Sequence, residues 1–426
     1  MGPGIILLLF GAFFLGIPIS FALGLTAFIG LVTADYPLTV VVQRIFTGID
    51  NYALIAIALF IFAGDLMAEG GISRRLVNFA NAIIGHFPAG LAMVSVLACM
   101  FFAAITGSAI AATAAIGGLM IPLMVEEKYE ARFAAPLLAC AGSIGPIIPP
   151  SIPLLVFGQL ANASVARLFV AGFVPGILMG IALMILSYFI GKKRNYRGRD
   201  RFAGWQEILR TGREAILALI TPIIIIGGIV SGIFTATESG AIAVVYSLII
   251  GLFVYKELTW RKVWELLKKS AISTGTVLIV VGCASLFIWY LTINQIPQTI
   301  AQLMMTFIHS RFVLLLVINI ILLIVGTFID TISAVVIFGP LFLPLTQAFG
   351  VDVTHYGLIL AVNLTIGMCT PPLGVDLFVA SAIAKVSIRE MWRDLIPLLG
   401  ALIVILLLIT YIPETVLWLP NVLGIK

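Results

Sequence analysis

The sequence predicts an all-α polytopic membrane protein that contains an inverted repeat. Three observations lead to this fold class: the composition, the continuity of the apolar segments, and a pair of motifs that occurs twice. The 426-residue chain is 62% hydrophobic and only 10% charged, and its mean hydropathy is +1.19. Soluble domains carry about 25% charged residues, so this chain has too few to cover a surface that faces water.

The apolar segments are continuous, which indicates helices and not the alternating strands of a membrane barrel. At about 20 residues per crossing, they have room for roughly ten to twelve helices and half-helices. We expect the first segment, residues 4–32, to be one retained helix, because no basic region precedes it and no cleavage pattern follows it. The four cysteines lie in apolar stretches without a Cys-x-x-Cys pair, so no disulfide, zinc or redox site is expected.

Two basic stretches orient the chain, and the positive-inside rule places both in the cytoplasm. Residues 191–214 are predicted to be a basic linker between a first repeat, 1–190, and a second repeat, 215–426. Residues 256–270 combine Trp260, Val263, Trp264, Leu266 and Leu267 with several lysines and are predicted to form an amphipathic helix in the membrane interface. Because the basic residues flank membrane segments, we expect lipid headgroups as their partners and no nucleic acid.

A constant shift, which we call the repeat shift, aligns motifs of the first half with motifs of the second half without a gap. One such coincidence is weak in a chain with 40 glycines and 20 prolines. A constant register across two separate motifs indicates a true internal repeat. The pairs that define the repeat shift are Ser108 with Asp330, Gly117 with Gly339, Pro122 with Pro344, Gly145 with Gly367, Pro149 with Pro371, and Pro150 with Pro372.

Residues 101–125 are predicted to form a helical hairpin that enters the membrane and turns back. The sequence Thr106-Gly107-Ser108 interrupts this apolar segment. Glycine permits a tight turn, and we expect the two hydroxyl groups to cap the helix that follows. The equivalent hairpin is predicted over residues 324–349. A single full helix with small residues at a helix contact is the alternative.

Residues 132–158 are predicted to form a broken helix, because four prolines lie between positions 146 and 153. Backbone opened at membrane depth is tolerated only where it is buried in protein or lines a polar cavity. Freed carbonyl oxygens suit sodium, and the N-terminus of the following half-helix suits a carboxylate. Residues 355–383 repeat this break, although a kink without a ligand is the alternative. The predicted fold is thus an inverted repeat with two re-entrant helical hairpins and two broken helices.

Asp330 lies deep in apolar sequence without a nearby basic residue. A lone aspartate at the bilayer centre costs about 2.5–3.5 kcal/mol on insertion scales, so we expect a bound cation as its counter-charge. Asp376 follows the second break and could serve the same cavity or a helix N-terminus. Catalysis is not expected, because the three histidines show no metal-ligand spacing and no nucleophile elbow or Walker loop is present.

In combination, these motifs resemble the large membrane subunit of tripartite ATP-independent periplasmic (TRAP) transporters. The segments that carry the resemblance are 105–122, 141–153, 234–246, 326–344 and 368–376. The resemblance implies an elevator-type secondary transporter of the bacterial inner membrane, in which a mobile domain with two hairpins slides against a scaffold. It implies that sodium ions are co-transported with an organic acid, such as sialic acid or a C4-dicarboxylate. As partners it implies a small four-helix membrane subunit and a periplasmic substrate-binding protein, and this chain resembles an unfused large subunit.

The resemblance also implies the residues of the site. One sodium site is expected at Thr106, Gly107, Ser108, Gly145 and Pro149, and the other at Asp330, Ser333, Gly367 and Thr370. Substrate contacts are expected at Ser108, Pro150, Ser151, Thr331, Pro372 and Asp376. The two sites need not have equal affinity, because Asp330 stands where the first half has Ser108. A stand-alone ion-coupled organic anion transporter is the alternative function, and a membrane enzyme is a further one.

Overall fold

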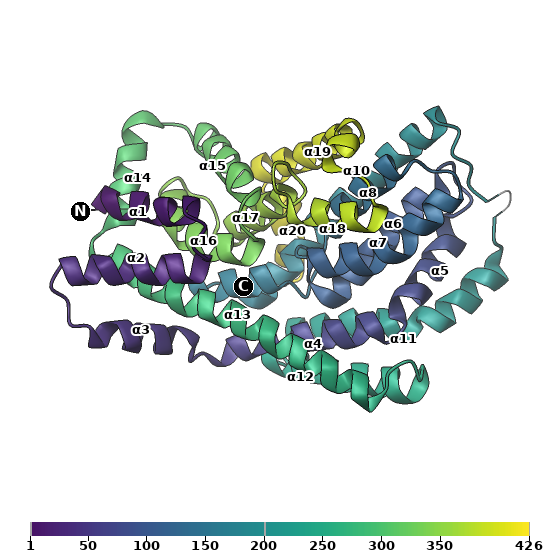
Figure 1. Ribbon diagram of the computed structural model, residues 1–426, viewed down its shortest axis with the longest axis horizontal. Helices are drawn as coiled ribbons and strands as arrows, with labels where there is room; N and C mark the ends of the chain where they lie inside the picture. The colour runs from purple at the N-terminus through teal and green to yellow at the C-terminus, as the bar shows by residue number, and fades with distance from the viewer. Residues whose placement is uncertain (1, 200–201, 426) are drawn as a thin grey trace.

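The computed structural model describes residues 2–199 and 202–425, and every regular element in these ranges is a helix (Figure 1). Eight helices of this part of the chain are long and apolar enough to cross a membrane. The structure therefore confirms the all-α polytopic fold class. The helices are α1 (Gly2–Phe14), α2 (Ile19–Thr33), α3 (Thr39–Ile49), η1 (Tyr52–Leu54), α4 (Ile55–Glu69), α5 (Ile72–Ile84), α6 (Gly90–Thr106), α7 (Ala109–Glu126), α8 (Ala131–Gly142), α9 (Ile152–Leu160), α10 (Val165–Lys193), α11 (Trp205–Val230), α12 (Ala236–Ile249), η2 (Ile250–Val254), α13 (Trp260–Ile293), α14 (Ile296–Phe307), α15 (Arg311–Gly326), α16 (Thr331–Ala348), α17 (Val353–Gly367), α18 (Val375–Ala384), α19 (Ile388–Tyr411) and α20 (Glu414–Val422).

The internal repeat is visible in the helix boundaries. The repeat shift carries both ends of α7 onto both ends of α16. It also carries the first residue of α8 onto the first residue of α17. Helix α9 begins next to the position that corresponds to the start of α18. The register inferred from a few residue pairs thus holds for whole helices.

The two halves interlock through these helices. Helix α18, which follows the second break, packs on α7 and α8 of the first half. Helix α9, which follows the first break, packs on α16 of the second half. In Figure 1, α18 lies beside α7 although the two helices come from opposite halves of the chain. Each hairpin therefore supports the broken helix of the other half.

Two helical hairpins are present, and both begin earlier in the chain than predicted. Helices α6 and α7 turn at Gly107 and Ser108, and α15 and α16 turn at residues 327–330. The predictions began at residues 101 and 324, but nothing breaks the apolar helix before these points, so the first arms extend back to Gly90 and Arg311.

The hairpins open toward opposite ends of α10, which spans 29 residues. Beside the C-terminal end of α10, Ala89 donates its N–H to the Tyr196 carbonyl oxygen at 3.1 Å. At the N-terminal end of α10, Arg167 lies 3.9 Å from Asp352, which caps α17 after the second hairpin. The repeat is therefore inverted. By the positive-inside rule, the end of α10 that carries Lys192 and Lys193 faces the cytoplasm.

Two long arms run side by side along one edge of the molecule (Figure 1). One arm is the continuous 34-residue helix α13. The other consists of α3 and α4, which are separated at Asp50 and Asn51. The Asn51 side chain accepts the N–H of Ala53 at 3.0 Å, so it starts a new helix where α13 continues uninterrupted.

Two predicted helices were wrong. The amphipathic stretch 256–270 does not form a helix of its own, because nothing between Trp260 and Ile293 interrupts α13. The first apolar segment forms two helices, since Gly16 has a φ of +75° and Pro18 has no N–H to continue α1. The basic linker 191–214 includes the end of α10, at Lys193, and the first turns of α11, which begins at Trp205.

Candidate ion and substrate site

The tip of the first hairpin is built by a glycine and a serine. Gly107 has a φ of +61°, a backbone conformation that residues other than glycine rarely adopt. Ser108 is extended, and its Oγ accepts the N–H of Ala111 at 3.3 Å, which caps α7. The predicted second cap is wrong, because the Thr106 hydroxyl instead donates to the Phe102 carbonyl oxygen of the preceding helix at 3.3 Å.

The first break comprises residues 143–151, between α8 and α9, and every residue in it is buried. Ser151 closes the break: its Oγ accepts the N–H of Leu154 at 3.2 Å and donates to the Pro146 carbonyl oxygen. The hairpin tip lies directly against this backbone. A Cβ on Gly107 would lie 2.1 Å from the Pro150 carbonyl oxygen, and one on Gly145 would lie 2.7 Å from the Ser108 carbonyl oxygen. Glycine is thus required on both sides of this contact.

The second half repeats the contact with different residues. Asp330 is the N-cap of α16, and its Oδ1 accepts the N–H of Ser333 at 3.0 Å. The second break comprises residues 368–374, and a Cβ on Gly367 would lie 2.5 Å from the Cα of Gly326. The Thr331 hydroxyl lies 2.9 Å from the Met368 sulfur. In both breaks the Pro-Pro peptide bond is cis.

A cavity of about 90 Å³ lies where the two hairpin tips meet the two breaks. We call it the central cavity. All four elements contribute to it, although they come from opposite halves of the chain. Its lining residues are Gly107, Ser108, Ala109, Ile110, Pro146, Ile152, Pro153, Asp330, Thr331, Ile332 and Met368.

Four predicted site residues therefore line the central cavity directly: Gly107, Ser108, Asp330 and Thr331. Six others lie in the tips, the breaks or the adjoining helix turns without lining it: Thr106, Gly145, Pro149, Pro150, Ser151 and Ser333. Gly367, Thr370 and Pro372 border or belong to the second break, and the Thr370 hydroxyl donates to the Ile366 carbonyl oxygen at 2.9 Å.

Asp376 does not line the central cavity. Its side chain is fully buried in the first turn of α18, which packs on α7 and α8. One carboxylate oxygen lies 4.0 Å from the Cys369 sulfur, and among the described residues the other has no hydrogen-bond partner. The sequence left open whether Asp376 serves the cavity or a helix N-terminus, and the structure places it in the first turn of α18.

Other polar groups were not predicted from the sequence, because they lie in separate apolar segments. The Asn363 side chain donates to Asn319 Oδ1 at 2.8 Å, and Asn319 donates to Thr410 Oγ1 at 3.0 Å. Amides inside apolar runs were the available signal, since such groups join membrane helices by hydrogen bonds. At the arms, Arg44 stacks on Trp289 at 4.9 Å, beside a cavity of about 350 Å³.

Comparison of the sequence with known proteins identifies a family with this architecture. The sequence profile of the tripartite ATP-independent periplasmic transporter, DctM component, matches residues 6–415. The isethionate TRAP transporter permease protein DctMQ of Oleidesulfovibrio alaskensis is 44% identical over 95% of this chain, which spans 65% of that relative's length. The sialic acid TRAP transporter large permease protein SiaM of Vibrio cholerae is 38% identical, with 96% of both chains covered. The C4-dicarboxylate TRAP transporter large permease protein DctM of Pseudomonas aeruginosa is 40% identical over 90% of both.

A solved structure shares the fold. The YdaH transporter of Alcanivorax borkumensis superposes with a TM-score of 0.61 over 88% of both chains, at 14% sequence identity. The family profile and the relatives agree along nearly the whole chain. The chain therefore belongs to the DctM component family of tripartite ATP-independent periplasmic transporters, and it is an integral protein of the inner membrane.

Proposed function

We propose that this chain is the subunit that carries an organic acid across the inner membrane, driven by co-transported sodium ions. The observation that carries the proposal is the central cavity, where two capped hairpin tips and two opened helices converge. In secondary transporters, discontinuous helices of inverted repeats form the sites for substrate and coupling ion near the bilayer midplane. Family membership supports transport, and the geometry supports ion coupling.

The two hairpin tips supply oxygen ligands of different charge. At the first tip the candidates are the Ser108 hydroxyl and backbone carbonyls near Gly145 and Pro149. At the second tip Asp330 adds a carboxylate, and among the described residues no basic side chain lies within 4 Å of it. An uncompensated carboxylate at membrane depth favours a bound cation. We therefore assign the stronger sodium site to Asp330, with Ser333, Gly367 and Thr370 nearby.

The size of the central cavity limits what can lie between the tips. A volume of about 90 Å³ is small beside the cavities of about 300–1,000 Å³ that enclose whole drug-sized ligands. This space suits an ion together with one carboxylate or sulfonate group. The body of a larger substrate, such as a sialic acid, would have to extend out of it. Three relatives are named for isethionate, C4-dicarboxylate and sialic acid, and each of these compounds carries such an acid group. We therefore propose an organic acid as the substrate class.

The partners follow from the family. TRAP large permeases work with a small membrane subunit and a periplasmic binding protein. We propose the same partners here, and we propose that the hairpins and broken helices move as one unit against the arms α3–α4 and α13. The interlocked packing of α7 with α18 and of α9 with α16 supports such a unit, because neither half could move without the other.

Reconstituted uptake tests the proposal. The chain, its small subunit and its binding protein would be placed in proteoliposomes, and uptake of labelled succinate, isethionate and N-acetylneuraminate would be measured. We expect uptake of at least one acid to require both partners and an inward sodium gradient. Equal uptake with choline in place of sodium would contradict sodium coupling. Uptake by the chain alone would contradict the subunit assignment and favour a stand-alone anion transporter.

A further inference from the structure

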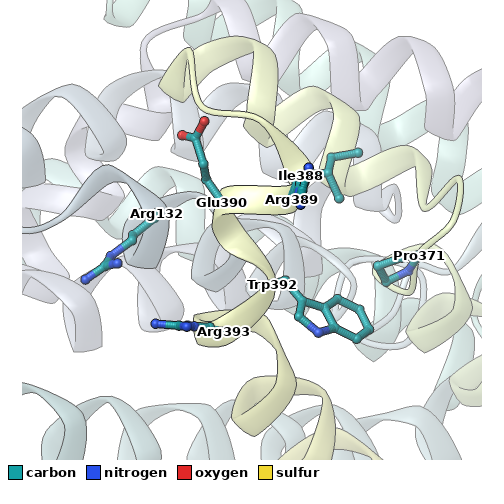
Figure 2. A pocket seen from close by; sticks show the side chains of 7 residues that line it. All are labelled: Arg132, Pro371, Ile388, Arg389, Glu390, Trp392 and Arg393. Atoms are coloured by element: carbon teal, nitrogen blue, oxygen red, sulfur yellow. The ribbon is translucent and has the colours of Figure 1, made fainter.

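A cavity larger than the central cavity lies at the start of α19, beside the second break. Its volume is about 810 Å³, and we call it the cytoplasmic basin. It lies outside the central cavity, and the two share no lining residue. Figure 2 shows its lining residues, which are Arg132, Pro371, Ile388, Arg389, Glu390, Trp392 and Arg393.

The basin has an excess of positive charge, with three guanidinium groups against one carboxylate. Arg132 is already engaged, because its Nε contacts Glu130 at 2.5 Å, and this hydrogen bond holds the pKa of the Glu130 carboxyl below its ordinary value. Among the described residues, Arg389 and Arg393 have no carboxylate within 4 Å. Such a cleft concentrates anions, and arginine pairs with carboxylate and sulfonate-type groups through two hydrogen bonds.

The carboxylate in the basin does not compensate these arginines. Glu390 accepts a hydrogen bond from the Ser387 hydroxyl at 2.9 Å, within the first turn of α19. In Figure 2 Glu390 points away from Arg393, which extends toward the side on which Arg132 lies. Trp392 points toward Pro371, so an indole ring lies between Arg393 and the second break.

The basin lies on the side of the molecule that carries the basic linker. Arg194, at the end of α10, is ion-paired with the buried Asp394 one turn after Glu390. The positive-inside rule places this end of α10 in the cytoplasm. Pro371 connects the basin to the second break, and Met368 of the same break lines the central cavity. One short loop therefore borders both cavities.

The repeat provides a comparison on the opposite side. The repeat shift pairs Arg389 with Arg167, at the other end of α10. Arg167 is fully engaged: it donates to the Ile425 carbonyl oxygen at 2.9 Å and to Asn421 Oδ1 at 3.1 Å, and it lies 3.9 Å from Asp352. Helix α20 packs there on α10 and α17. Of this pair, Arg389 at the cytoplasmic end is the arginine without an ion pair among the described residues.

We propose that the cytoplasmic basin is a binding site for an organic anion, in which Arg389 and Arg393 supply the positive charge that attracts its carboxylate or sulfonate group and Trp392 contacts the remainder. The identity of that anion as the released substrate rests on the proposed function, whereas the binding itself does not. The phosphate of an anionic lipid headgroup offers the same negative charge to these arginines, and Trp392 is about half exposed beside them.

Binding can be measured without transport. The chain would be placed in phosphatidylcholine nanodiscs in choline buffer and titrated with succinate and isethionate, with tryptophan fluorescence as the readout. Trp392→Phe assigns the signal to the basin. We expect saturable binding that weakens about tenfold or more in the Arg389→Gln/Arg393→Gln double variant, because two charge-assisted contacts are lost. Arg261→Gln is the matched control, since this arginine lies on the same side with a side chain that is 91% exposed.

The lipid arm distinguishes the two sources of the anion. If a headgroup occupies the basin, adding phosphatidylglycerol will weaken succinate binding to the wild type, and native mass spectrometry will find more phosphatidylglycerol retained by the wild type than by the double variant. Both that result and succinate binding unaffected by phosphatidylglycerol support the site, and they identify its occupant. Binding of succinate, isethionate and phosphatidylglycerol that is unchanged in the double variant overturns it. Sodium-independent uptake with basin binding intact would contradict the proposed function and still support the basin.

Discussion

The two breaks interrupt equivalent helices at equivalent positions, but they differ in solvent exposure. Every residue of the first break is buried, whereas Pro372 and Leu373 in the second are exposed, Leu373 by 45%. The first break is sealed by α10, where Gly172 comes so close that a Cβ on it would lie 2.2 Å from the Ile147 carbonyl oxygen. Under the repeat shift Gly172 corresponds to Asp394 on α19. An aspartate does not permit that approach, so we expect this difference between the equivalent helices to contribute to the different exposure of the two breaks.

Thiol labelling gives the largest expected contrast between the two breaks. Leu373→Cys and Ser151→Cys place a thiol at equivalent positions, one 45% exposed and one fully buried. We expect the first to react about 100-fold faster or more, because labelling a buried thiol requires local opening. A Cys283→Ala background removes the partly exposed native thiol. Equal rates would contradict the comparison, and so would labelling of Leu373→Cys from the periplasmic side alone.

A substitution in the sealing helix tests why the first break is closed. Gly172→Ala should destabilise the protein by about 1–3 kcal/mol, the usual cost of overpacking a tight contact. Gly118→Ala is the control, since nothing lies within 4 Å of a Cβ at that position in α7. Thermal unfolding in detergent measures both. A Gly172→Ala variant as stable as the control would show that close approach does not seal the break.

Substituting the N-cap residues of the two hairpins tests their contribution to sodium binding separately from their contribution to folding. Asp330→Asn keeps a good N-cap residue for α16 but removes the charge, so we expect the sodium concentration for half-maximal uptake to rise about tenfold. Ser108→Ala should raise it less, because this tip contributes no charge. Uptake at varied sodium concentration measures both. A larger effect at Ser108 would reverse the assignment of the stronger site.

The smallest expected effect concerns the contact between α9 and the jointed arm. Asn51 donates to Gln159 Oε1 at 3.1 Å, whereas Ser381, which corresponds to Gln159 in the second half, donates to the carbonyl oxygen of Val386 just after its own helix. Gln159→Ala should change the uptake rate about two- to fivefold, the effect of one ordinary hydrogen bond. Ser381→Ala should leave it unchanged. A stronger effect at Ser381 would show that this asymmetry does not bear on transport.

Much of this architecture was predictable because its signals are local. Glycine in a turn, a hydroxyl or carboxylate before a helix, and prolines inside an apolar run act over a few residues, and a constant register then identified their partners. Tertiary features were not predictable in this way. The buried direction of Asp376 depends on how α18 packs, and the cytoplasmic basin joins residues from α8, the second break and α19. The amphipathic stretch before Ser270 was predicted as a separate helix because its polarity differs from that of the following segment. No residue there interrupts the backbone of α13, so the two segments form one helix.

The arms have a mechanical consequence. Helix α13 is an unbroken strut of 34 residues, which at about 1.5 Å per residue is roughly 50 Å long. Its companion is jointed at Asp50 and Asn51, beside the end of α9. Hinges are a few residues between elements that absorb changes in backbone angle. We therefore expect a displacement of α9 relative to the arms to change backbone angles at Asp50 and Asn51, whereas α13 beside them stays straight.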